Sequence, residues 1–157
     1  MFITKDWVQE KGACLGGMKY FLEHWPEGAE YQTILDQLAK DNEAGYADWL
    51  MEHAGRTDAV MEVQGDLKVE GNIFFAGFIR VSGFLSAGLR IKAGEGIKAG
   101  EDFGIYAGLR LRISLKAKYA LVVAKEVPKN LLLGIFKPQN GSPQESEVEA
   151  GETSSNG

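Results

Sequence analysis

Residues able to do nucleophilic, acid–base or metal chemistry are few in this 157-residue chain. Both histidines, His24 and His53, and the only cysteine, Cys14, fall within the first 57 residues. Their spacing matches no metal-ligand or Cys–His motif. We therefore interpret the histidines as partly exposed groups at helix ends and Cys14 as a small buried thiol. No catalytic residue, metal ligand or cofactor site is predicted.

Two carboxylates, Glu95 and Glu101, lie six positions apart, as paired acid–base carboxylates could. The Gly94-Glu95-Gly96 run is superficially similar to a phosphate-binding loop. No Lys-Ser or Lys-Thr pair follows that run, however, and the repeat described next explains both glutamates as corner residues. These residues favour a protein that is not an enzyme.

Apolar residues keep to alternate positions over an unusually long stretch, from Val63 to Val123. Twenty-five of the 31 odd positions there are apolar, and only Glu95 and Glu101 are charged. A β-strand shows this period of two, but single strands run only about 5–6 residues. Tight hairpins would shift the parity at each turn. The unbroken parity instead favours a parallel β-helix, whose corners do not reverse the chain.

A second period of six supports the same fold. Positions 65, 71, 77 and 83 are glycine, and the same slot then holds Leu89, Glu95, Glu101 and Ala107. Three such hexads form one coil of 18 residues, which predicts about four coils over residues 58–136. Hexapeptide-repeat acyltransferases and β-helical carbonic anhydrases need histidine in their coils, and this segment has none.

Residues 1–57 have the apolar spacing of short helices. Thr4 or Asp6 is placed to cap a first helix, and apolar stripes follow at 15–22, 31–38 and 46–53. The fold class is therefore α+β, a helical cap module followed by a single-stranded parallel β-solenoid. Phe74, Phe78 and Phe84 occupy outward positions in the first hexads. They either pack beneath the helices or form a partner surface.

Charge differs in sign along the chain. Residues 1–57 carry a net charge of −5, residues 58–136 carry +3 and residues 137–157 carry −3. At 18-residue spacing, two outward ladders are predicted. One contains Arg80, Lys98 and Lys116, and the other contains Lys92 and Arg110. Each ladder is either a solvated face or a basic strip for an acidic partner, including nucleic acid.

The C-terminal part contains an apolar run and then a polar tail. Leu131, Leu132, Leu133, Ile135 and Phe136 are candidates for an oligomer interface at the exposed last coil. Residues 137–157 are predicted to be a disordered acidic tail. A single cysteine allows no internal disulfide, and neither a signal peptide nor a membrane span is indicated. We therefore expect a cytoplasmic protein.

Two segments carry a family resemblance. Gly65–Ile73 (Gly-Asp-Leu-Lys-Val-Glu-Gly-Asn-Ile) and Ala87–Gly100 resemble the short hexads of bactofilin-type polymer-forming proteins and of phage and prophage proteins. Lys11–Cys14, with Trp49-Leu50, resembles a small helical module of phage-associated proteins. The first resemblance implies end-to-end self-assembly. The second implies a small inhibitor or adaptor, for example one that blocks a host defence system as anti-CRISPR proteins do.

Taken together, these patterns predict a protein-binding module that docks sterically on a larger partner. Two alternatives stay open. One is a self-assembling scaffold that pairs through its last coil, and the other is nucleic-acid binding through the basic solenoid face.

Overall fold

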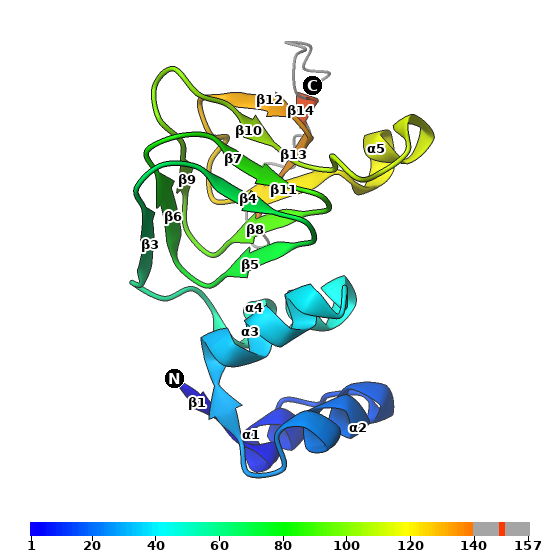
Figure 1. The fold of residues 1–157 in the computed structure, drawn as a ribbon. Helices are drawn as coiled ribbons and strands as arrows, with labels where there is room; N and C mark the ends of the chain where they lie inside the picture. The colour runs from blue at the N-terminus through cyan, green and yellow to red at the C-terminus, as the bar shows by residue number, and fades with distance from the viewer. Residues whose placement is uncertain (140–147, 150–157) are drawn as a thin grey trace.

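The structure, a computed structural model, describes residues 1–139 and 148–149. Four helices come first: α1 (Lys5–Glu10), α2 (Leu15–His24), α3 (Tyr31–Lys40) and α4 (Ala44–Ala54). Two short strands, β1 (Phe2–Ile3) and β2 (Ala29–Glu30), pair antiparallel beside them. Beyond α4 the chain winds into a stack of short parallel strands (Figure 1).

Local sequence explains where the helices begin and end. The Thr4 hydroxyl accepts a hydrogen bond from the Trp7 N–H at 3.1 Å and caps α1, as predicted. Pro26 follows α2, and Gly55, at φ 81°, follows α4. The predicted stripe on α3 is buried and comprises Tyr31, Ile34, Leu35 and Leu38. The helical interpretation of residues 1–57 is therefore confirmed.

The solenoid has three faces, each made of one parallel sheet. The first face contains β3 (Val60–Val63), β6 (Phe78–Val81) and β9 (Ile97–Lys98). The second contains β4 (Leu67–Val69), β7 (Leu85–Ala87), β10 (Ile105–Tyr106) and β12 (Leu131–Leu133). The third contains β5 (Ile73–Phe75), β8 (Ile91–Ala93), β11 (Leu121–Ala124) and β13 (Ile135–Pro138), with β14 (Val148–Glu149) antiparallel at its edge.

The first two coils follow the predicted 18-residue period. Leu67 lies beside Leu85, Ile73 beside Ile91 and Ile79 beside Ile97 in adjacent coils. The inward side chains form one apolar core in which Ile79, Leu85 and Ile91 are fully buried. The prediction of a β-solenoid with about four coils is confirmed.

The helical module covers one edge of the first coil. In Figure 1, α3 and α4 lie against β5. The Gln32 amide accepts a hydrogen bond from the Ala76 N–H at 3.1 Å and donates one to the Phe74 carbonyl at 2.7 Å. This side chain therefore replaces the peptide group of a missing neighbouring strand, and it satisfies an edge that would otherwise be open.

Asparagines make a second junction between the two parts. The Asn72 amide group donates to the Ala39 carbonyl and to Asn42 Oδ1, while Asn72 Oδ1 accepts from the Arg90 N–H of the next coil. Asn72 is buried and all of these polar atoms have partners. Helical module and solenoid are thus joined by fully paired polar groups.

Two insertions interrupt the period in the third coil. Ile79 to Leu85 is six positions, whereas the equivalent step from Ile97 to Ile105 is eight, which adds two residues. Leu85 to Ile91 is also six positions, whereas Ile105 to Val122 is seventeen, which adds eleven. The second insertion contains α5 (Ile113–Tyr119), a helix that the sequence pattern did not predict.

The length of each insertion decides which parity faces inward. Two extra residues leave the odd positions inside, so Ile105 and Ala107 are buried. Eleven extra residues reverse the parity, so Ala120, Val122 and Ala124 are buried instead. The prediction that the odd stripe stays buried to Val123 is therefore wrong beyond Ala107. The exposed exceptions include Phe103, Leu109, Ile113, Leu115 and Tyr119.

The same insertions break the predicted basic ladders. Arg80 does lie beside Lys98 in the first sheet, but Lys116 is carried away on α5. Lys92 has Val123 as its neighbour, not Arg110. Both ladders assumed a constant 18-residue period, and this assumption fails after β9.

At the far end, the last coil is shorter than the others. Leu121 pairs with Ile135 only 14 positions later, and the described part of this coil has strands on two faces only. Lys137 and Pro138 belong to β13, so they extend the solenoid beyond the predicted boundary at 136. The rest of the predicted tail, apart from Gln139 and β14, lies outside the described residues.

Candidate partner-binding surface

The segment from Gly108 to Ala120, which we name the α5 arm, leaves the solenoid after β10 and returns to it at β11. Gly108 has φ 74°, and a Cβ atom there would lie 2.4 Å from the Cβ of Ala120. Only glycine allows this left-handed turn and this close approach. The two ends of the arm therefore meet at one point, while α5 projects to the side of the sheets (Figure 1).

Cationic side chains hold the base of the arm against the solenoid. The Lys116 ammonium donates to the Gly108 carbonyl, and the Arg110 guanidinium donates to the Glu70 carbonyl at 3.3 Å. The Tyr119 ring has the Arg90 guanidinium 5.9 Å and the Lys118 ammonium 5.5 Å from its centroid. These contacts give the arm a defined position relative to the coils.

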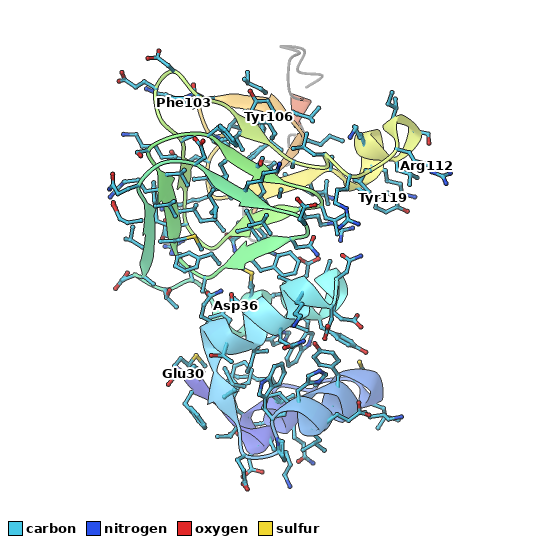
Figure 2. The ribbon with its side chains drawn as sticks, viewed as in Figure 1. Glu30, Asp36, Phe103, Tyr106, Arg112 and Tyr119 are labelled. Atoms are coloured by element: carbon cyan, nitrogen blue, oxygen red, sulfur yellow. The ribbon has the colours of Figure 1, made fainter. Side chains whose placement is uncertain are left out.

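The outer part of the arm exposes apolar side chains. Ile113 is 86% exposed, a high value for a branched aliphatic residue. Leu109, Leu115 and Tyr119 are also exposed, at 47%, 39% and 37%. Figure 2 shows Arg112 and Tyr119 on this projecting segment, away from the three sheets. A cluster of exposed apolar residues of this kind is typical of a contact surface.

The arm is also the most uniformly basic part of the molecule. Residues 103–125 contain five basic residues, Arg110, Arg112, Lys116, Lys118 and Lys125, and no aspartate or glutamate. Arg110, Arg112 and Lys118 are exposed. Long basic side chains among apolar ones can bind an acidic surface and exclude water from its apolar parts.

The predicted basic residues outside the arm have partners already. Arg80 donates to Glu62 Oε1 at 3.2 Å, and Lys98 lies exposed beside it. The Lys92 ammonium lies 2.6 Å from Asp48 Oδ1 on α4, and the Lys92 side chain is only 13% exposed. Lys92 therefore joins the solenoid to the helical module. Lys116 and Arg110, which the ladders separated, come together in the arm.

The three outward phenylalanines have different environments. Phe74 is 3% exposed and belongs to the core of the helical module. Phe78 is half-buried on β6, where the Arg80 guanidinium lies 5.2 Å from its ring centroid. Phe84 is half-buried and its N–H donates to Asp66 Oδ1 at 2.9 Å. Only Phe74 is shown to pack beneath the helices, and it is not accessible to a partner.

The C-terminal interface candidates also separate into two groups. Ile135 and Phe136 are 8% and 4% exposed, so their side chains face inward and are closed to a partner. Leu131 and Leu133 are half-buried on β12, whereas Leu132 is 56% exposed. The shift of parity explains this, because Phe136 continues the even inward positions begun by Val122.

The titratable residues of the sequence analysis lie in structural settings. The Glu95 carboxylate pairs with Arg56 at 2.8 Å and with Lys125 at 3.8 Å, and Glu101 is exposed at a turn. His24 Nδ1 and His53 Nδ1 lie 2.9 and 2.8 Å from carbonyls one helical turn earlier. Cys14 is exposed rather than buried, because its Sγ caps α2 by accepting from the Gly17 N–H.

Within residues 1–139 and 148–149, no three His, Cys, Asp or Glu side chains are grouped so that they could hold a metal ion. In the same part of the chain, no helix has the length and hydropathy to cross a membrane.

Sequence reasoning missed the arm because its residues alternate as a strand would. From Leu109 to Leu115 every second residue is apolar, which extends the hexad pattern. One signal was available: the stretch between Asp102 and Glu126 contains no acidic residue, whereas acidic residues are interspersed in the earlier coils. A change in charge pattern inside a repeat is therefore a better marker of an insertion than its hydrophobic period.

Comparison with known proteins adds information on the helical module. Residues 1–57 match a family model described as the YdhT N-terminal domain, and this range ends where the sequence predicted the module to end. Comparison with curated proteins and with solved structures gave no match. Over residues 1–57, then, the chain is similar to the YdhT N-terminal domain.

Proposed function

We propose that this protein is a non-enzymatic docking module that binds an acidic, partly apolar surface of another protein through the α5 arm. The observation that carries the proposal is the arm itself, where Ile113 is 86% exposed among basic residues with no acidic residue nearby in sequence. Burial of such side chains on a partner is favourable by roughly 25 cal/mol per Å² of apolar area.

The mixture of side chains favours a protein partner over nucleic acid. Nucleic-acid surfaces are read mainly through phosphates, which need cations but no exposed aliphatic groups. Leu109, Ile113 and Leu115 have no role in such binding, whereas aliphatic and aromatic residues form the centre of protein interfaces. The net charge of −5 over the helical module would also repel a polyanion.

Docking of this kind acts sterically. The solenoid core and the paired junction with the helical module make a firm support, and the arm places its contact residues outside that support. A partner bound to the arm is covered by the bulk of the coils. The same mechanism suits an inhibitor that blocks a larger complex, such as a phage-encoded inhibitor of host defence.

Site-specific photo-crosslinking in host cells tests the proposal. A photoreactive phenylalanine analogue replaces Ile113 in one variant and Val60 in the control, because Val60 is also exposed (49%) but lies on β3. We expect a protein adduct from position 113 and none from position 60. Charge reversal by Arg112→Glu and Lys118→Glu should remove that adduct.

Two results would contradict the proposal. An adduct that disappears after nuclease treatment would assign the arm to nucleic acid. The same adducts from positions 113 and 60, unchanged by charge reversal, would show that contact at the arm is non-specific.

A second candidate is self-association through β12, favoured by one observation. β12 is the edge strand of its sheet, and Leu132 on it is 56% exposed. Such an edge can pair with another strand. Light scattering over a range of concentrations should then show a larger mass that Leu132→Lys returns to the monomer. A constant monomer mass would reject this candidate.

A further inference from the structure

A second surface feature lies in the helical module, far from the arm. A cavity of about 480 Å³ opens between α1–α2 and α3–α4, and its walls are mostly apolar. Its size is within the range of small-molecule sites. The aromatic residues among its lining are Tyr20, Phe21, Trp25, Tyr46 and Trp49.

The glycine at the mouth of this cavity indicates that the space is kept open. Gly45 lies in the first turn of α4 and lines the cavity, and a Cβ atom added there would meet nothing within 4 Å. Glycine in a helix costs up to about 1 kcal/mol relative to alanine. Since no neighbouring atom requires glycine at position 45, packing alone does not explain it.

Electron-rich rings form one corner of the cavity. The Tyr20 ring centroid lies 5.9 Å from that of Trp25 and 5.6 Å from that of Tyr46, and both neighbours are tilted against it. All three side chains are half-buried, so their faces stay partly accessible. Ring faces arranged in this way attract an organic cation.

A carboxylate reinforces that attraction. The Tyr20 hydroxyl donates to Asp41 Oδ2 at 2.6 Å, and this hydrogen bond is the largest cause that lowers the pKa of Asp41 below its ordinary value. Asp41 is therefore ionised at neutral pH, behind the ring that forms the corner. Residues 1–57 carry ten acidic and five basic side chains, so the whole module favours a positive ligand.

From these observations we infer that the helical module binds a small organic ammonium ion with methylated nitrogen, its head group against Tyr20, Trp25 and Tyr46. The methyl groups pack on the rings and the charge is balanced by Asp41. The apolar part of the cavity beyond the rings takes the rest of the ligand. This site is independent of the α5 arm and of its partner.

Choline and its neutral carbon analogue 3,3-dimethylbutan-1-ol, which have the same shape, are suitable probes. Binding to the full chain is followed by tryptophan fluorescence and by calorimetry. We expect choline to bind roughly 5- to 30-fold more tightly than the analogue, since only the charge differs. Asp41→Asn should weaken choline binding several-fold and leave the analogue unaffected.

Gly45→Leu tests the location, because its side chain would occupy the open space without meeting backbone. We expect loss of choline binding with an unchanged circular dichroism spectrum. Gln9→Leu adds the same side chain at an exposed position of α1 and serves as the control. The inference is overturned if choline does not bind, if the neutral analogue binds equally well, or if Gly45→Leu binds choline as well as Gln9→Leu does.

Discussion

The two halves of the solenoid use the same repeat with different regularity. From β3 to β8 every strand meets its neighbour at 18 residues, and the first coil is closed by the helical module. From β9 onward the spacing between neighbouring strands becomes 20, 26, 31 and 14 residues. The regular half contains the junction with the helices, and the irregular half contains the exposed arm.

This difference shows that corners, and not strands, absorb change in a parallel solenoid. The inward side chains of all coils still form one core, in spite of thirteen inserted residues in the third coil. An insertion at a corner disturbs no ladder, so it adds surface without removing core. Residues free of packing duties are the ones that can be selected for contact with a partner.

The largest effect that would test this comparison comes from the regular core. Leu85 is fully buried in the middle of its sheet, so Leu85→Ala should lower the free energy of unfolding by about 2–5 kcal/mol. Ile113→Ala on the arm should change it by less than about 0.5 kcal/mol. Urea denaturation measures both. A similar loss in the two variants would mean that the arm is part of the core.

A smaller effect is expected at the junction that closes the regular half. Gln32→Leu leaves the Ala76 N–H and the Phe74 carbonyl without partners, which should cost about 1–3 kcal/mol. Gln37→Leu, one turn and a residue later on α3, removes only a hydrogen bond to the exposed Asp41 and is the matched control. Hydrogen exchange at Ala76 should accelerate in the first variant alone. Unchanged exchange there would argue against an edge-closing role for Gln32.

Removal of the arm should have almost no effect on stability. Because Gly108 and Ala120 are in contact, a Gly-Ser-Gly link in place of residues 109–119 can close the gap. We expect the free energy of unfolding to change by about 1 kcal/mol or less, with loss of the crosslinked partner. A large destabilisation would show that the two halves differ less than the strand register indicates.

The smallest effect is a pH dependence confined to the helical module. The pKa of Asp41 is lowered in the folded state, chiefly by the Tyr20 hydroxyl, so ionised Asp41 stabilises the module above its unfolded pKa of about 4. That contribution is lost as pH falls through the lower folded value. Asp41→Asn should therefore flatten the acid limb of thermal unfolding. The same acid limb in both proteins would contradict this.

The sequence predicted the regular parts because their physics is local and periodic. Alternation and the glycine slot identified the coils, and capping residues such as Thr4 located helix starts. The arm and its neighbours could not be predicted from hydrophobic period, since Leu109–Leu115 suits a strand or an exposed segment equally well. Which one forms depends on how Gly108 turns the chain, and this depends on tertiary contacts with Ala120.

The cavity in the helical module was equally invisible in the sequence. Tyr20, Tyr46 and Trp49 have the spacing of core residues, and the stripes assigned them to packing. Their half-buried state results from the angle between two pairs of helices, which no single stripe encodes. Ion pairs across the parts, such as Lys92 with Asp48, are unpredictable for the same reason.

The Gln32 and Asn72 contacts have one more consequence, for the symmetry of the fold. A repeating solenoid is nearly unchanged by translation through one coil, so a cap could settle on it in more than one phase. The positions one coil beyond Asn72 and Phe74 are Arg90 and Lys92, which offer neither the amide nor the buried ring. The amide contacts thus break the translational degeneracy and define the origin from which all later coils are counted.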